Sequence, residues 1–166
     1  MTRSHRQVLA PDAASLRTVL GHFATGVAIV TAIDGDEPVG MACNSFTSVS
    51  LEPQLVLFCA AKSSTTWPRI QAAGKWAANI LDEDGEEVCR LFAEKGADRF
   101  AHLEYTTGRT GAPILDDALA FVDCETLDEH DAGDHVIVVG RVLELGYSSE
   151  SKPLLFYRGG YGRFDV

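Results

Sequence analysis

The amino-acid sequence predicts a mainly β protein built as a closed antiparallel barrel with a few peripheral helices. The chain has many short apolar runs that end in turn-forming residues, and only two or three amphipathic segments with helical spacing. Strands and helices do not alternate regularly, which argues against a doubly wound parallel sheet. With 166 residues, 46% of them hydrophobic, the chain is expected to form a single domain over residues 1–166.

The first elements are expected to be a helix and a hairpin. Residues 1–12 are predicted to form a flexible arm, and Asp12 can cap a helix that ends at Gly26. The apolar face of this helix recurs at three- and four-residue spacing, at Leu16, Val19, Leu20 and Phe23. Residues 27–33 form an almost continuous β-branched run, and Asp34-Gly35 supplies turn chemistry before the second strand. The chain therefore enters its sheet as a hairpin.

The central stretch, residues 39–67, contains two apolar runs that each lead into a bend rich in small polar residues. VGMAC leads into NSFTSVS, and LVLFCAA leads into KSSTTW. Such bends bring backbone N–H groups close to a ligand, because small side chains leave room and hydroxyls add donors. Pro68 marks the first turn of a helix at residues 67–73, whose N-terminus would hold an anion. Simple helix capping would also account for these Ser and Thr residues.

The second half of the chain continues the strand-rich pattern. It is expected to contain, in order, a strand at residues 75–81, an amphipathic helix at 86–95, a long surface connection at 98–113, strands at 118–126 and 136–145 around a charged turn at 128–133, and a last strand at 152–157. Gly159 and Gly160 form a bend after it. No internal repeat, linker or second domain is visible in the sequence.

Composition excludes several classes of function. The net charge of −10 and the dispersed 14 Lys and Arg residues disfavour a nucleic-acid partner. The four cysteines form no C-x-x-C pair and have no histidine at ligand spacing, so neither a metal site nor a disulfide framework is predicted. No leader peptide and no apolar run of about 20 residues is visible, so no membrane association is expected and the protein is predicted to be cytoplasmic.

Several segments, taken together and in order, carry a family resemblance. They are ATGVAIVTA, the stretch from Val39 to Trp67, GDH at residues 133–135, and PLLFYRGGYGRF. In this order they resemble the flavin reductase-like family, the small reductase components of two-component flavin monooxygenases. The resemblance covers residues 16–164 and implies an FMN-binding split β-barrel, normally a homodimer. It also implies hydride transfer from NAD(P)H to FMN or FAD and release of reduced flavin, by diffusion, to a separate monooxygenase.

The resemblance assigns flavin contacts to three parts of the chain. The ring is expected at Met41, Ala42, Cys43, Asn44 and Ser45, largely through backbone amides, and the ribityl phosphate at Cys59, Ala60, Ala61, Ser64, Thr65 and Thr66. Leu91 and Phe92 are further expected contacts, but many relatives carry arginine where Leu91 stands. Either Arg90 or Arg99 then takes the place of that arginine, or the contact with the flavin tail is weaker. The choice between FMN and FAD stays open.

The dinucleotide donor has no G-x-G-x-x-G site in this sequence and must bind over the flavin. The resemblance places it against His135, Tyr157, Arg158, Gly159 and Gly160, with Arg158 pairing with the pyrophosphate. NADH is favoured over NADPH because no basic patch surrounds the GDH segment. Hydride transfer between two aligned rings needs no acid or base, so no catalytic side chain is predicted.

Two alternative functions stay open at this point. A barrel that holds its flavin tightly could act on an organic substrate of its own, although the chain has no insertion to form a substrate pocket. A flavin-binding barrel without catalysis is the other, although it would have no use for a second dinucleotide site at residues 133–135 and Arg158.

Overall fold

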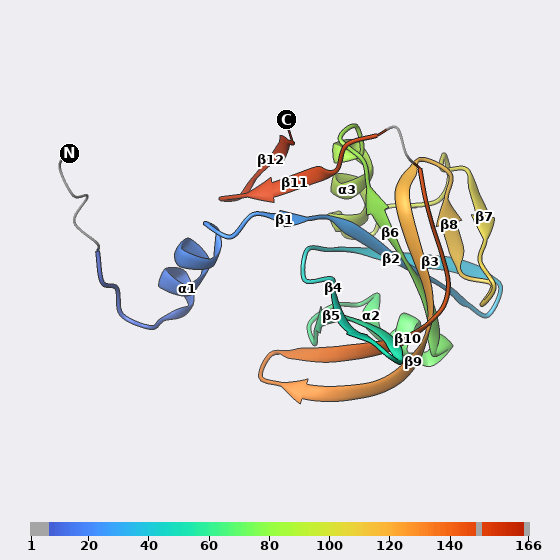
Figure 1. Ribbon diagram of the computed structural model, residues 1–166, viewed down its shortest axis with the longest axis horizontal. Coiled ribbons are helices and arrows are strands. Elements are labelled where there is room, and N and C mark those ends of the chain that lie inside the picture. Colours follow the sequence, from blue (N-terminus) through green and yellow to red (C-terminus); the bar gives the residue numbers. More distant parts are fainter. Residues whose placement is uncertain (1–6, 149–150, 165–166) are drawn as a thin grey trace.

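The computed structural model describes residues 7–148 and 151–164, which form three helices and twelve strands (Figure 1). The helices are α1 (Ala13–Leu20), α2 (Trp67–Ala73) and α3 (Glu86–Ala93). The strands are β1 (Thr25–Gly26), β2 (Ala28–Asp34), β3 (Glu37–Cys43), β4 (Thr47–Leu51), β5 (Gln54–Ala61), β6 (Lys75–Leu81), β7 (Tyr105–Thr107), β8 (Pro113–Leu115), β9 (Ala118–Ala132), β10 (His135–Tyr147), β11 (Leu154–Tyr157) and β12 (Gly160–Arg163). The prediction of a mainly β protein is confirmed.

The main sheet has seven antiparallel strands in the order β3-β2-β6-β9-β10-β5-β4. It curls strongly, but its edge strands β3 and β4 do not pair, so no sheet among the described residues closes into a barrel. The predicted closed barrel is therefore not confirmed. Only a short bend separates Cys43 from the start of β4, so whether β3 pairs with β4 depends on how the whole sheet curls.

Two small sheets complete the fold. β1, β11 and β12 form one, and β7 pairs with β8 in the other. β1 and the β11–β12 hairpin lie next to α1, on the side of the molecule away from the β7–β8 hairpin (Figure 1). The second strand of the C-terminal hairpin, β12, follows the predicted glycine bend and was not expected from the sequence.

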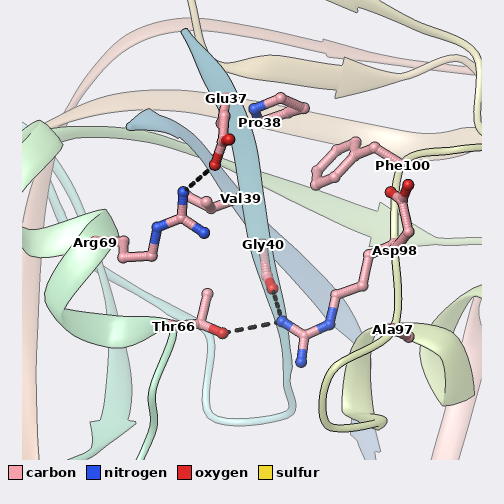
Figure 2. A pocket seen from close by; sticks show the side chains of 10 residues that line it. Glu37, Pro38, Val39, Gly40, Thr66, Arg69, Ala97, Asp98 and Phe100 are labelled. Atoms are coloured by element: carbon pink, nitrogen blue, oxygen red, sulfur yellow. Dashed lines mark hydrogen bonds and ion pairs between the residues drawn. The ribbon is translucent and has the colours of Figure 1, made fainter. Parts of the chain in front are cut away.

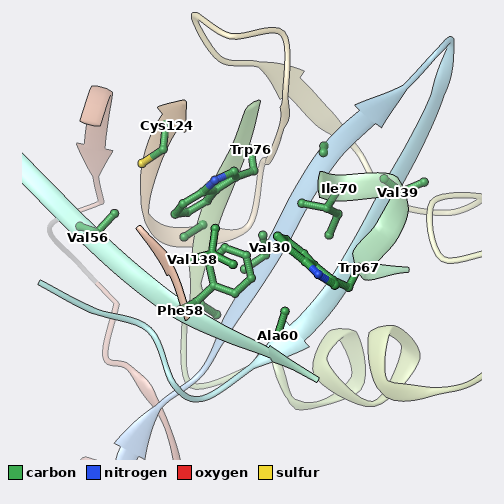
Figure 3. Packing of buried hydrophobic residues seen from close by; sticks show 13 residues of the cluster. Val30, Val39, Val56, Phe58, Ala60, Trp67, Ile70, Trp76, Cys124 and Val138 are labelled. Carbon is green, nitrogen blue, oxygen red and sulfur yellow. The ribbon is translucent and has the colours of Figure 1, made fainter. Parts of the chain in front are cut away.

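The main core lies inside the curled sheet and beneath α2 (Figure 3). Phe58 packs edge-on against Trp67 and Trp76, with ring centroids 5.9 and 4.8 Å away. Trp76 also requires a glycine opposite it, since a Cβ at Gly140 would lie 2.4 Å from the Trp76 ring. Burying three large aromatic rings fixes α2, and with it the polar bend that precedes α2, against the sheet.

A second core cluster joins α3 to β2 and the C-terminal hairpin. Ile29, Phe92 and Leu154 are its largest buried members. Phe92 packs so closely on β3 that a Cβ at Gly40 would lie 2.6 Å from its ring. The fold therefore holds α3 directly behind the strand that leads to the first polar bend.

Several boundaries differ from the sequence predictions. α1 ends at Leu20, with Gly21 as its C-cap, and Gly26 lies in β1. The predicted charged turn at residues 128–133 is wrong, because β9 continues to Ala132 and turns only at Gly133, where φ is +66°. Residues 128–132 of β9 pair only with β10, at the edge of the main sheet, and most of them are exposed, so no apolar alternation marks the strand. The expected surface connection at residues 98–113 contains β7 and the first residue of β8.

The predicted arm at residues 1–12 falls partly outside the described residues, which begin at Gln7. Residues 7–12 form no helix or strand and are exposed. No helix in the described part of the chain is long and apolar enough to cross a membrane.

Candidate functional site

Three cavities are lined in part by residues that the sequence predicts to bind a ligand. The largest, a groove of about 940 Å³, lies between α1, the bend after β3 and the turn between β11 and β12. A smaller apolar pocket of about 260 Å³ adjoins it and shares Asn44 and Phe156 with it. A third cavity of about 410 Å³ lies between β3, the start of α2 and residues 97–100.

The first polar bend opens into two of these cavities. Asn44 lines both the groove and the apolar pocket, Ser45 lines the groove, and Ala42 and Cys43 line the pocket. Met41 instead packs against the main core. No backbone–backbone hydrogen bond among the described residues uses Asn44 or Ser45, although the Ser45 backbone is hydrogen-bonded to the Cys43 thiol. The backbone groups of Asn44 are therefore available to a ligand.

Cys43 is not a nucleophile in this environment. Its thiol lies 3.7 Å from the Ser45 hydroxyl, and burial raises the pKa of the Cys43 thiol. A raised pKa keeps the thiol protonated and unreactive at neutral pH.

The second polar bend caps α2. The Ser64 hydroxyl accepts hydrogen bonds from the backbone N–H groups of Thr66 and Trp67, at 3.2 and 3.1 Å. Thr65 is exposed, and Thr66 lines the third cavity. The bend therefore both caps the helix and faces a cavity, so the two readings of the sequence are compatible.

Some predicted flavin contacts lie away from the cavities. Ala60 and Phe92 are fully buried in the two cores, and Leu91 is half-buried on α3. Cys59 is partly buried, and Ala61 pairs with His135 across the β5–β10 ladder. Ala60 has no exposed surface in the backbone or the side chain, so it offers no contact to a ligand in this chain.

Arg99 lies beside the second bend, whereas Arg90 pairs with Glu86 on its own helix. Figure 2 shows the cavity at this bend, with Thr66 on one side and Gly40 of β3 next to it. The Arg99 guanidinium donates from Nη1 to the Gly40 carbonyl oxygen at 2.7 Å and to the Thr66 hydroxyl at 2.9 Å. Burial lowers the pKa of Arg99. Arg90 points elsewhere, because it pairs with Glu86 at 2.7 Å and lies over the Tyr161 ring.

The charge of Arg99 has no carboxylate partner in the described part of the chain, and its Nε is buried without a hydrogen bond. The other arginine of this cavity, Arg69, is paired with Asp34 and Glu37. Lys62, a second candidate cation, is paired with Asp131. Arg99 is therefore the cation at this bend that an anionic ligand can use without displacing an acidic side chain.

The predicted dinucleotide residues are divided between two hairpins. Arg158 and Gly159 form the β11–β12 turn and line the groove, while the neighbouring Tyr157 packs edge-on against His22 at 6.4 Å. His135 begins β10, and its Nδ1 lies 2.8 Å from the Asp134 carboxylate. The hydrogen bond with His135 lowers the pKa of Asp134. Gly160 begins β12 at the base of the turn.

Sequence reasoning missed the contribution of α1 to the groove. Arg17, Thr18 and His22 line it, and they come from the segment that was expected only to present an apolar face. Arg17 could have indicated a binding role for this helix, because it is the one basic residue in it. No group of three or more His, Cys, Asp or Glu side chains suited to a metal ion occurs in residues 7–148 and 151–164.

Comparison with known proteins identifies the family. Residues 20–165 match the family described as Flavin reductase like domain. A flavin reductase from Pseudomonas putida is 50% identical over 149 residues, covering 89% of this chain and 88% of that protein. The reductase subunit of a flavin-dependent monooxygenase from Rhodococcus jostii is 47% identical over 150 residues, covering 90% of this chain and 77% of that protein.

A solved structure is similar over nearly its full length. The NADH:FAD oxidoreductase of Streptomyces globisporus, in complex with NAD and FAD fragments, has a TM-score of 0.90 and 36% identity, covering 96% of this chain and 98% of that chain. The chain thus has the fold, the polar bends and the sequence of this group, and it belongs to the flavin reductase like domain family.

Proposed function

We propose that this protein is an NAD(P)H:flavin oxidoreductase that favours NADH, reduces FMN or FAD and supplies the reduced flavin to a separate monooxygenase. The observation that carries the proposal is the position of the Asn44–Ser45 bend between two cationic sites, Arg99 and Arg158. A reaction between a flavin and a nicotinamide dinucleotide needs a surface for aligned rings with an anion site for each tail.

The flavin fits the bend and the cavity beside Arg99. We assign its ring edge to the backbone of Asn44 and Ser45, beside Ala42 and Cys43, and its phosphate to Thr66 and Arg99. Gly40, which Arg99 contacts, lies four residues before Asn44 on an extended strand, so the two subsites are roughly 13 Å apart. That separation suits a ring at one end and a ribityl phosphate at the other. Arg99 rather than Arg90 takes the role left open by Leu91.

The nicotinamide donor fits the groove on the open side of the bend. We assign Arg158 to its pyrophosphate, the glycines of the β11–β12 turn to close backbone approach, and His135 to a further polar contact. The bound flavin accepts the hydride. The protein aligns the two ligands and excludes water between them, without a proton-transferring side chain.

Assembly and location follow from the same proposal. We propose a homodimer with the split-barrel fold of the family, because α1 has no buried residue and exposes Leu16, Val19, Leu20 and Phe23. A second copy of the chain is the occupant that covers this apolar face. We place the protein in the cytoplasm, which holds the nicotinamide donor and suits four cysteines that form no disulfide.

A single anaerobic experiment tests the proposed function. Purified protein is mixed with NADH and an excess of FMN or FAD, and the flavin absorbance band is followed; the experiment is repeated with NADPH. Bleaching of many equivalents supports a reductase that uses flavin as a substrate, and the faster pair identifies the cofactors. Bleaching of a single equivalent would instead indicate a barrel that holds its flavin, and no bleaching would indicate a binding protein.

The exposure of the site favours exchange of the flavin over tight retention. Asn44 is exposed and Ser45 is half-buried in the single chain. A flavin on this surface stays accessible and can leave after reduction.

A further inference from the structure

The groove beside the first bend is cationic in a strongly acidic protein. The chain carries a net charge of −10, yet the groove is lined by Arg17, His22 and Arg158 and by no aspartate or glutamate. We propose that Arg17 of α1 is a binding residue for the anionic pyrophosphate of the dinucleotide donor and acts as a pair with Arg158. This inference rests on the proposed function and adds a residue from a different element to it.

Backbone contacts bring the two arginines to one groove. The Gly21 N–H donates to the Arg17 carbonyl oxygen, and the Arg158 N–H donates to the Gly21 carbonyl oxygen, both at 2.9 Å. A Cβ at Gly21 would lie 3.5 Å from the Arg158 Cα and 3.1 Å from the Arg17 oxygen. The α1 C-terminus and the β11–β12 turn therefore meet through a glycine, and Arg17 stands one helical turn before that contact.

Neither arginine is neutralised by an acidic side chain within hydrogen-bonding reach. Arg69, Arg90 and Arg163 each have a carboxylate oxygen within 2.8 Å, whereas Arg17 and Arg158 have no ion pair among the described residues. An anion entering the groove can pair with both guanidinium groups without displacing a carboxylate, so the full charge-assisted interaction is gained.

The backbone conformation of Arg158 supports a ligand role for its side chain. Arg158 has φ +51° and Gly159 has φ +80°, so both loop residues of the hairpin are left-handed. Such a two-residue turn favours Asn-Gly, and a long side chain at its first position is strained. An arginine held in this conformation points to a function that the turn itself does not require.

Arg17 also acts on the second dinucleotide hairpin. After the hydrogen bond with His135, the positive charge of Arg17 is a further cause of the lowered pKa of Asp134. The effect of Arg17 on Asp134 is the smallest of the causes of this shift, and Arg17 shares the groove with Arg158 rather than with the β9–β10 turn.

The test compares Arg17→Ala and Arg17→Lys with wild type in steady-state flavin reduction. Removing a charge-assisted hydrogen bond should raise the KM for NADH about tenfold or more, with the KM for flavin unchanged, and Arg17→Lys should recover part of the loss. The control is Arg163→Ala, because Arg163 is an exposed arginine paired with Asp84, outside the groove. It should leave both KM values unchanged.

A donor without phosphates separates binding from structural damage. With 1-benzyl-1,4-dihydronicotinamide, Arg17→Ala should reduce flavin at the wild-type rate, since no pyrophosphate is present to bind. Arg158→Asn adds a second check, because asparagine suits the turn. It should keep or raise the Tm while raising the KM for NADH.

The outcomes distinguish this inference from the proposed function. An unchanged KM for NADH in Arg17→Ala, or an equal loss with the phosphate-free donor, would overturn the role of Arg17. If wild type reduces no flavin with NADH, the proposed function fails, and calorimetric titration with ADP then reports on the groove alone. Weaker ADP binding by Arg17→Ala than by Arg163→Ala would still support an anion site, and equal binding would overturn it.

Discussion

The Ser45 hydroxyl is hydrogen-bonded to both backbone groups of Cys59, accepting from the N–H at 2.9 Å and donating to the carbonyl oxygen at 3.3 Å. The β4–β5 ladder pairs Thr47 with Leu57, so position 45 stands opposite position 59 where the next pair would form. The two hydrogen bonds of the Ser45 side chain take the place of the backbone pairing that residues 45 and 59 would otherwise form. The backbone of the bend is thereby held in place against β5 without using its own N–H and C=O groups.

Replacing Ser45 with alanine should destabilise the protein. Ser45→Ala leaves the partly buried Cys59 N–H and C=O without this partner, which should lower the free energy of unfolding by about 1–3 kcal/mol. Urea denaturation measures the change. The matched control is Ser48→Ala on β4, an exposed serine, and equal losses in the two variants would contradict the bridging role.

Removing Arg99 should weaken binding of phosphorylated flavins only. Arg99→Ala should lower the affinity for FMN about tenfold or more, because a half-buried cation beside Thr66 is lost. Affinity for riboflavin, which has no phosphate, should be unchanged in a fluorescence titration. Arg90→Ala is the control and should bind both flavins normally, since Arg90 pairs with Glu86. Parallel losses for FMN and riboflavin would indicate structural damage instead.

A negative charge at Ser64 should separate flavin binding from stability. Aspartate caps helices as well as serine does, so Ser64→Asp should keep the Tm while repelling the flavin phosphate and weakening FMN binding. Ser64→Ala should do the reverse, costing about 0.5–2 kcal/mol of stability with a smaller effect on FMN. Thermal unfolding and FMN titration measure the two effects. Unchanged FMN affinity in Ser64→Asp would remove this bend from the flavin site.

Charging the apolar face of α1 should dissociate the proposed homodimer. Wild type should sediment at twice 17.9 kDa, and Phe23→Glu, at a side chain that is 75% exposed in a single chain, should shift it toward the single mass. Leu127→Glu, at an exposed position on β9, is the control and should stay dimeric. A wild-type protein that is active as a monomer would rule out the interface.

The Cys89–Tyr161 contact should give the protein a stability change at alkaline pH. The two side-chain atoms lie 3.2 Å apart, and this hydrogen bond, together with burial, raises the pKa of Tyr161 to about 12. Because the folded pKa exceeds the unfolded value of about 10, this contribution to stability is complete below pH ~10 and is lost as the pH rises toward 12.

Absorbance titration of tyrosinate, combined with denaturation at each pH, measures this effect. Cys89→Ala should lower the Tyr161 pKa toward 10 and flatten the dependence of stability on pH in that window. Tyr161→Phe should abolish the late-titrating tyrosine. A tyrosine titration that is identical in wild type and Cys89→Ala would show that the contact has no influence.

Local signals in the sequence predicted the elements that local chemistry defines. The bounds of α2 and β6 were predicted correctly because Pro68 opens the helix and Gly74, with φ +64°, ends it. Local signals of this kind cannot predict whether the sheet closes into a barrel, because the pairing of β3 with β4 depends on how the whole sheet curls. The length of β9 was missed because its second half is mostly exposed at the edge of the sheet and has no apolar period.

The site was predictable only where its residues are neighbours in sequence. Asn44 and Ser45 were expected at the site from the family resemblance and from their place in a polar bend, and both line the groove. The sequence alone could not show whether Arg99 or Arg90 lies beside the second bend. The answer depends on the contact of Arg99 with Gly40, which is 59 positions away in the chain. Arg17 was missed because its groove forms only when the C-terminal turn binds Gly21.

The absence of any buried residue in α1 has a consequence for enzyme assays. An isolated helix of eight residues is unstable in water, so α1 should stay folded only while a second copy covers it. Dilution below the dissociation constant of the dimer would then unfold α1 and withdraw Arg17 from the groove. We therefore expect specific activity at limiting NADH to fall as the enzyme is diluted, so that the quantity of enzyme in the cuvette itself sets the apparent affinity for the donor.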